Sequence, residues 1–220
     1  MTDPITERHS EALTPELITD PTAKAEREAR NGLQQFDTAI KLIEEWTSGA
    51  RPFRLRPSLV LQLHRVALDG LSAYAGNWRP AGVRIEGSAH EPVGAHLVPE
   101  RIESMCDYVN DHWGDRTAIH LAAYLLWRLN WIHPFDDGNG RTARAVSYVV
   151  LCIRLGYKVP GTRTIPDQIS ENKQPYYLAL EAADKADRTG SVDVSQLEEY
   201  VKSLLAEQLL SVVRDASGSS

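Results

Sequence analysis

Residues 133–144 read HPFDDGNGRTAR, and this stretch decides how the chain is interpreted. His133 precedes a proline, which disfavours the α conformation, so a helix is predicted to end there. Glycine and asparagine both tolerate a positive φ, so the following Asp-Gly-Asn-Gly predicts a tight loop. Apolar residues recur at helical spacing on both sides, over 117–131 and 142–155. The stretch is therefore predicted to be a helix–loop–helix.

The residue types in this loop suit the chemistry of phosphate groups. Successive backbone N–H groups of the turn are predicted to bind an anion at the start of the second helix. That turn consists of Gly138, Asn139 and Gly140. Arg141 and Arg144 would lie on one helix face and contact phosphate oxygens. Asp137 offers an oxygen ligand of the kind that Mg²⁺ takes beside phosphates, and His133 can accept a proton near neutral pH.

Simpler interpretations and other phosphate or metal motifs compete with this one. A histidine before proline, or Asp-Gly-Asn-Gly alone, is usually only a helix end or a turn. One turn rarely needs all of these residues together, which favours a functional site. No Gly-Lys-Ser/Thr follows a predicted strand, which excludes a Walker phosphate loop, and the absence of His-Glu-x-x-His disfavours a zinc protease.

The stretch resembles the signature of the Fic domain family, His-Pro-Phe-x-Asp-Gly-Asn-Gly-Arg-x-x-Arg, at every fixed position. The related Doc toxins usually carry lysine at the second glycine, so the chain is more similar to the adenylyltransferase branch. Residues 76–79, 83–99 and 172–180 also resemble recurring segments of the family.

The resemblance implies a protein adenylyltransferase that moves AMP from ATP to a Ser, Thr or Tyr hydroxyl of a target protein, with Mg²⁺ as cofactor. It implies that His133 takes the hydroxyl proton and that Asp137 holds the metal. It implies phosphate binding by the glycine turn and the Asn139 side chain, with Arg141 near the β-phosphate and Arg144 near the γ-phosphate.

Other functions remain open at this point. Fic-type enzymes that move UMP or phosphocholine, or that remove AMP, share the same motif. A non-catalytic module that senses ATP is disfavoured because binding alone needs no base at His133. A DNA-binding regulator is disfavoured because the net charge of −6 gives no electrostatic footprint for nucleic acid.

The fold class is predicted to be all-α, a Fic-type helical core with one small β-hairpin flap. We expect a flexible arm over 1–19, an N-terminal helix within 20–50, a catalytic domain over 51–213 and a polar tail over 214–220. Alternation over 83–86 and an extended stretch at 95–98 predict the hairpin. The resemblance implies that this flap holds a target segment by strand addition. Further helices are predicted at 57–71, 99–113, 174–187 and 194–213, with 166–173 a loop or short helix.

The N-terminal helix is predicted to start after Asp20-Pro21 and to dock through an apolar stripe that includes Leu33 and Phe36. The resemblance implies that this helix can inhibit the enzyme, with Glu28 pairing to Arg144. Lys24 and Ala29, however, stand where the family carries Ser/Thr and Gly/Asn. The alternative that Glu28 is a solvated helix charge stays open.

The remaining expectations concern surroundings and partners. No apolar leader or membrane-length stretch is present, so the expected location is cytoplasmic, with no membrane partner. No nucleic-acid partner is expected. The identity of the target protein and the formation of a homo-oligomer are left open. Cys106 and Cys152 are expected to be core thiols rather than a disulfide.

Overall fold

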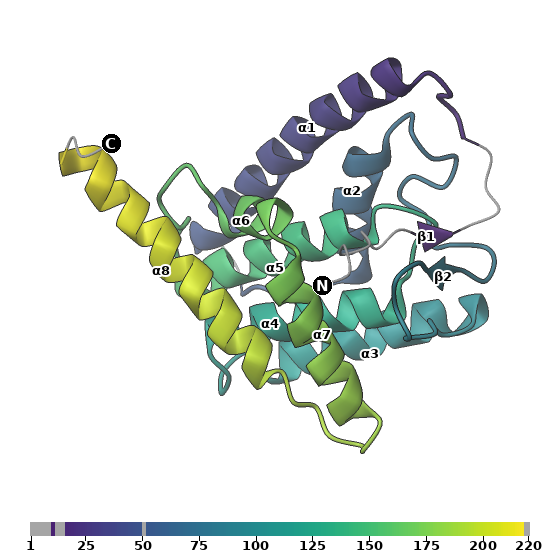
Figure 1. The fold of residues 1–220 in the computed structure, drawn as a ribbon. Helices are drawn as coiled ribbons and strands as arrows, with labels where there is room; N and C mark the ends of the chain where they lie inside the picture. The colour runs from purple at the N-terminus through teal and green to yellow at the C-terminus, as the bar shows by residue number, and fades with distance from the viewer. Residues whose placement is uncertain (1–9, 12–15, 50–51, 218–220) are drawn as a thin grey trace, which may run out of the picture.

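A computed structural model describes the whole chain except residues 1–9, 12–15, 50–51 and 218–220. Its fold is built around two central helices, α4 (Ala118–Ile132) and α5 (Asn139–Leu155) (Figure 1). Helix α4 is buried along nearly its whole length because its sequence is almost entirely apolar. Thr117 caps it by accepting the N–H of His120 at 3.0 Å. The α4–α5 pair therefore forms a rigid base for the loop between them.

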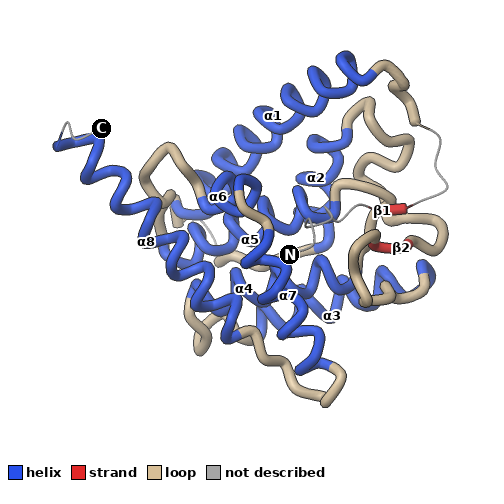
Figure 2. Tube along the Cα trace, viewed as in Figure 1, coloured by secondary structure: helices blue, strands red, loops and turns tan. Residues whose placement is uncertain are grey.

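Other helices surround this pair, and Figure 2 shows how little of the chain is strand. They are α1 (Pro21–Thr47), α2 (Pro57–Leu68), α3 (Val98–Asp111), α6 (Ile165–Glu171), α7 (Gln174–Asp187) and α8 (Ser195–Ser217). The predicted all-α class and the predicted helices are confirmed, with shifts of a few residues at their ends. Helix α8 continues to Ser217, so it includes part of the predicted tail. Helix α5 starts at Asn139, so half of the predicted loop is its first turn.

Helix α1 begins as predicted, with Asp20 accepting the N–H of Ala23 at 2.7 Å. The predicted apolar stripe is only partly buried: Ile43 is buried and Ile40 packs against the core, but Leu33 and Phe36 do not. Leu33 and Phe36 are 70% and 43% exposed, whereas Asn31 and Gln35 are buried. The amide groups of Asn31 and Gln35 donate to backbone carbonyls of α2 and of the turn after it, at 2.8 to 3.2 Å. These hydrogen bonds fix the rotation of α1 about its own axis. The spacing of apolar residues in the sequence does not reveal such polar contacts.

The predicted hairpin is wrong. Strand β2 (Arg84–Ile85) pairs antiparallel with β1 (Ser10–Glu11), and Ser10 lies opposite Ile85. The expected second strand is instead a 3₁₀ turn, Ala95–Leu97, that leads into α3. The stretch at 95–98 was too short for its sequence to distinguish a strand from the approach to a helix that carries Pro99 in its first turn. The flap is thus a single strand, paired with a segment of the arm that was expected to be flexible. Most of the rest of that arm lies outside the described residues.

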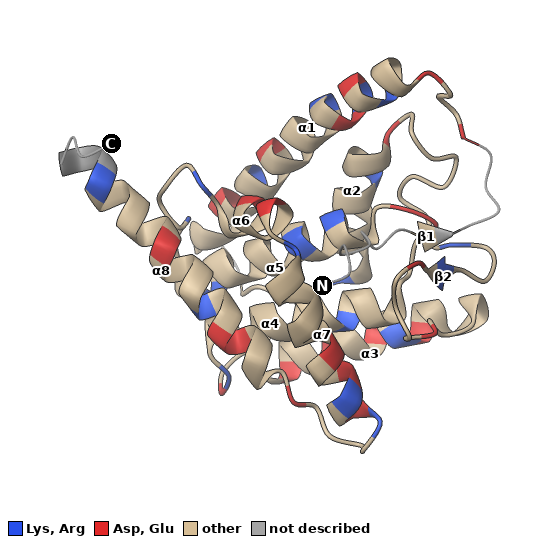
Figure 3. Cartoon of the chain, viewed as in Figure 1, with Lys and Arg blue, Asp and Glu red and all other residues tan. Residues whose placement is uncertain are grey.

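Three smaller findings complete the description. Cys106 and Cys152 are free and buried, as expected, and burial raises the pKa of Cys106 to about 12. Within the part of the chain that is described, no helix is long and apolar enough to cross a membrane. Figure 3 shows basic and acidic residues interspersed along the helices rather than gathered by sign.

Candidate active site

A cavity of about 760 Å³ lies at the α4–α5 loop, bordered by the start of α1, the flap and α7. Every site residue predicted from the sequence lines it. These are Glu28, His133, Asp137, Gly138, Asn139, Gly140, Arg141 and Arg144. The cavity volume is within the usual range for a small-molecule ligand. The structure therefore brings the motif and the N-terminal helix to one site.

His133 ends α4 in the left-handed region, with φ of 50°, as expected for a break in the helix before proline. Its ring is buried, and this burial lowers the pKa of His133 to about 3, although the carbonyl of Asn130 partly opposes the shift. The imidazole is therefore neutral near pH 7. Its Nε2 lies 2.8 Å from Oγ of Ser10 on β1. A neutral imidazole at hydrogen-bond distance from a hydroxyl has the geometry of a general base.

Gly138 caps α5 in a conformation that requires glycine. Its φ is +73°, and a Cβ placed there would lie 2.2 Å from Cδ2 of Leu68. Its carbonyl accepts the N–H of Thr142 at 2.9 Å, which closes the first helical turn. The first N–H groups of a helix have no intrahelical acceptors and carry the positive end of the helix dipole. The start of α5 is thus suited to an anion, as predicted from the glycine turn.

The Asn139 side chain holds the loop together. Its Oδ1 accepts the N–H of Phe135 and its Nδ2 donates to the carbonyl of Phe135, both at 2.9 Å. The same Nδ2 lies 3.3 Å from Oγ of Ser10. The sequence-based expectation gave this amide to phosphate, whereas in the structure it clamps the backbone and reaches the hydroxyl.

His64 of α2 is a site residue that the motif did not reveal. Its Nδ1 accepts the N–H of Gly76 at 3.0 Å, so the hydrogen must be on Nε2, which donates to the carbonyl of Asp137 at 3.0 Å. Its ring stacks on Phe135 with 3.5 Å between centroids. Burial lowers the pKa of His64 to about 4, which keeps it neutral. His64 therefore positions the loop, and only its place in the fold identifies it.

Arg79 is a second residue whose role the sequence left unassigned. It is buried, and its Nε donates to the carbonyl of His133 at 2.7 Å. Its two terminal nitrogens donate to the carbonyls of Ala81 and Val93. One guanidinium thus connects the backbone of His133 to both ends of the flap segment. The recurring segment at 76–79 pointed to this residue without indicating its contacts.

The two aspartates of the motif have different environments. Asp136 is buried and accepts the hydroxyl of Ser72 at 2.8 Å. The Asp137 side chain is 57% exposed, and its Oδ2 lies 3.1 Å from Nη2 of Arg141. No group of three or more His, Cys, Asp or Glu suited to a metal occurs among the described residues. An exposed carboxylate at the start of α5 fits Mg²⁺, which typically takes one or two protein carboxylates and completes its shell with phosphates and water.

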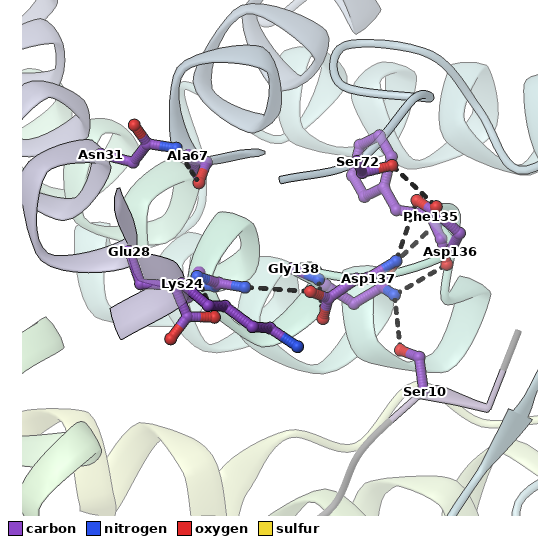
Figure 4. Close-up of polar contacts among 12 residues, drawn as sticks. Ser10, Lys24, Glu28, Asn31, Ala67, Ser72, Phe135, Asp136, Asp137 and Gly138 are labelled. Carbon is purple, nitrogen blue, oxygen red and sulfur yellow. Dashed lines mark hydrogen bonds and ion pairs between the residues drawn. The ribbon is translucent and has the colours of Figure 1, made fainter. Parts of the chain in front are cut away.

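Glu28 reaches this site but has a different partner from the expected one. Its Oε1 lies 3.7 Å from Nη1 of Arg141, whereas Arg144 was the expected partner. Figure 4 shows Lys24 and Glu28 approaching the motif loop from one side and Ser10 from the other. Arg144 lines the cavity, and burial lowers the pKa of its guanidinium. The structure thus brings Glu28 of α1 within ion-pair distance of the motif, at Arg141.

The fold and this cavity define a helical domain that presents a neutral histidine beside a helix N-terminus. Residues 54–151 match the Fic/DOC family. The chain belongs to this family.

Protein adenylyltransferase Fic of Drosophila persimilis is 31% identical over 161 residues, which are 71% of this chain and 29% of the relative. Protein adenylyltransferase fic-1 of Caenorhabditis elegans is 30% identical over 130 residues, 58% of this chain and 24% of the relative. The chain thus spans less than a third of the length of these relatives.

Solved structures agree with the fold. A Fic domain containing signaling protein from Bacteroides thetaiotaomicron superposes with a TM-score of 0.67 at 25% identity, covering 86% of this chain and 74% of that one. Fic-1 from C. elegans superposes with a TM-score of 0.69 at 21% identity, covering 92% and 55%.

Proposed function

We propose that this chain transfers AMP from ATP to a hydroxyl group of a protein, with His133 as the general base. The observation that carries the proposal is the neutral His133, whose Nε2 meets a hydroxyl inside a cavity that also contains the start of α5 and two arginines. The names of the curated relatives, protein adenylyltransferases, support this reaction.

In the proposed reaction, Nε2 of His133 accepts the proton of the acceptor hydroxyl. The hydroxyl oxygen forms a bond to the α-phosphorus, the bond from that phosphorus to the bridging oxygen of the β-phosphate breaks, and pyrophosphate leaves. The first N–H groups of α5, with Arg141 and Arg144, offset the negative charge of the phosphates. The net charge of −6 disfavours a nucleic acid as the partner.

Asp137 is the residue that would hold Mg²⁺, and the ion would supply positive charge to the phosphates. The carboxylate now contacts Arg141 in an exposed ion pair. Such pairs contribute about 0–1 kcal/mol, so the carboxylate can exchange this partner for a cation at little cost.

Glu28 is proposed to restrain the enzyme through Arg141. A guanidinium that contacts both Glu28 and Asp137 has fewer donors left for phosphate oxygens. The restraint would therefore act on the first arginine of the motif. Arg144 was the partner inferred from the family resemblance.

The test is incubation with Mg²⁺ and ATP labelled at the α- or the γ-phosphate, in the presence of a protein extract. Label that reaches protein only from the α-position supports AMP transfer. Label from the γ-position would indicate phosphoryl transfer instead. Absence of label from both, with transfer from labelled UTP or from a phosphocholine donor, would assign the chain to another Fic-type reaction.

A further inference from the structure

Ser10 occupies the place at which an acceptor hydroxyl would have to lie. Its Oγ is 2.8 Å from Nε2 of His133 and lines the same cavity as the motif. The two residues are separated by 123 positions in the sequence, so the contact reflects tertiary docking rather than local geometry. Figure 4 shows the side chain projecting from the β1 backbone toward the motif loop.

The backbone around Ser10 is held by the flap. Ser10 and Glu11 pair antiparallel with Ile85 and Arg84 of β2, and the register places Ser10 opposite Ile85. Strand addition to an exposed edge fixes a peptide's direction and register through main-chain hydrogen bonds, and it alternates the side chains between faces. The pairing with β2 thus fixes which side chain of β1 is turned toward His133.

The hydrogen bonds also orient the Ser10 hydroxyl. Nδ2 of Asn139 can only donate, so Oγ of Ser10 accepts at 3.3 Å. Oγ of Ser10 also lies 2.8 Å from Nε2 of His133, which is neutral and accepts the hydroxyl proton in the tautomer that carries its hydrogen on Nδ1. Ser72 lines the same cavity but differs, because its hydroxyl donates to the carboxylate of Asp136. Ser10 therefore contacts the proposed base His133, whereas Ser72 contacts the buried carboxylate of Asp136.

We propose that Ser10 is an acceptor site of this enzyme, modified by AMP within its own chain. The inference rests on the proposed AMP transfer. Oγ of Ser10 forms a bond to the α-phosphorus of ATP, its proton passes to Nε2 of His133, and pyrophosphate leaves. The product is a phosphodiester that joins Oγ of Ser10 to adenosine through the phosphate of AMP.

Docking of β1 favours reaction within one chain, and the shortness of its pairing favours release afterwards. Docking of β1 converts a bimolecular encounter into an intramolecular one, which raises the effective concentration of the hydroxyl. The pairing involves only two residues on each strand, and isolated pairs of this length are marginal in water. After modification the bulkier Ser10 can leave, which frees the edge of β2 for a segment of another protein.

The experiment is mass spectrometry of the purified full chain after incubation with Mg²⁺ and ATP. We expect a mass increase of one AMP, and fragmentation is expected to locate it on Ser10. Ser10→Ala should lose this adduct, whereas Ser104→Ala, which removes an exposed hydroxyl from α3, should retain it. His133→Ala should also lose it, because the base is missing.

Dilution separates reaction within the chain from reaction between chains. The first-order rate constant of Ser10 modification should stay unchanged on dilution, and an inactive His133→Ala copy added to the wild type should remain unmodified. An apparent first-order rate constant that falls in proportion to protein concentration would overturn the cis assignment.

A protein extract in the same incubation separates the two proposals. AMP on extract proteins or on other residues of the chain, with Ser10 unmodified, would overturn the assignment of Ser10 and leave AMP transfer intact. Absence of AMP from every protein would overturn both.

Discussion

Gly138→Ala should strongly destabilise the fold around the motif. An alanine at φ of +73° costs about 1–2 kcal/mol relative to an ordinary helical or extended conformation. Its methyl group would lie 2.2 Å from Cδ2 of Leu68, a fully buried residue, so the core must also shift. Overpacking of this kind costs about 1–3 kcal/mol. The two effects together predict a loss of about 2–5 kcal/mol in the free energy of unfolding.

Chemical denaturation of wild type and variants measures this effect, and the chain provides a matched control. Gly32 lies within α1, and a methyl group at this position would have nothing within 4 Å. Gly32→Ala should therefore raise the free energy of unfolding by about 0.5–1 kcal/mol. In the double variant Leu68→Ala/Gly138→Ala the overlap is removed, so the loss should be smaller than the sum of the two single losses. A Gly138→Ala variant within about 0.5 kcal/mol of wild type would refute the reasoning, since that is the range of an ordinary surface substitution.

The remaining predictions concern the site. His133→Ala should reduce AMP transfer by about 10²–10⁴-fold and largely spare ATP binding, measured side by side, because the ring is a base and not a cationic phosphate ligand. Since the folded-state pKa of His133 is lowered to about 3, the wild type should lose stability as pH falls through the unfolded value of about 6.5 toward 3, and His133→Ala should show a shallower loss in denaturation series. Asp137→Ala should abolish metal-dependent transfer, and full activity of the wild type in excess chelator would contradict the metal assignment. Glu28→Gly should raise self-modification, and Arg141→Ala added to it should remove the gain; unchanged labelling of Glu28→Gly would show that the ion pair is not inhibitory.

The sequence predicted what is encoded locally. The apolar run of α4, the proline after His133 and the glycine at 138 each determine the backbone near themselves, so the helix–loop–helix was predictable. The clustering of the candidate site residues was predictable because all of them except Glu28 belong to one contiguous motif. The match of the motif to the Fic signature then identified the family.

The parts that could not be predicted depend on contacts between distant segments. The partner of β2 is β1, and no local alternation signals that pairing. The rotation of α1 depends on hydrogen bonds from Asn31 and Gln35 to carbonyls of a neighbouring segment. The apolar pattern does not contain these contacts, so it placed Leu33 and Phe36 on the buried face, although both are exposed. His64 and Arg79 act on the loop through backbone groups, which no motif records.

The N-terminal segment engages the motif at two separate points, and these act on different reactants. Glu28 contacts Arg141, which belongs to the phosphate side, whereas Ser10 contacts His133, which belongs to the hydroxyl side. Loss of the contact between Glu28 and Arg141 would therefore free Arg141 to bind phosphate, while the hydroxyl of Ser10 still contacts His133. Under the proposed function, relief of Glu28 should increase modification of Ser10 before modification of other proteins. Under the same proposal, a target segment that pairs with the edge of β2 taken by β1 needs β1 to leave first, so the departure of Ser10 would control its access to that edge.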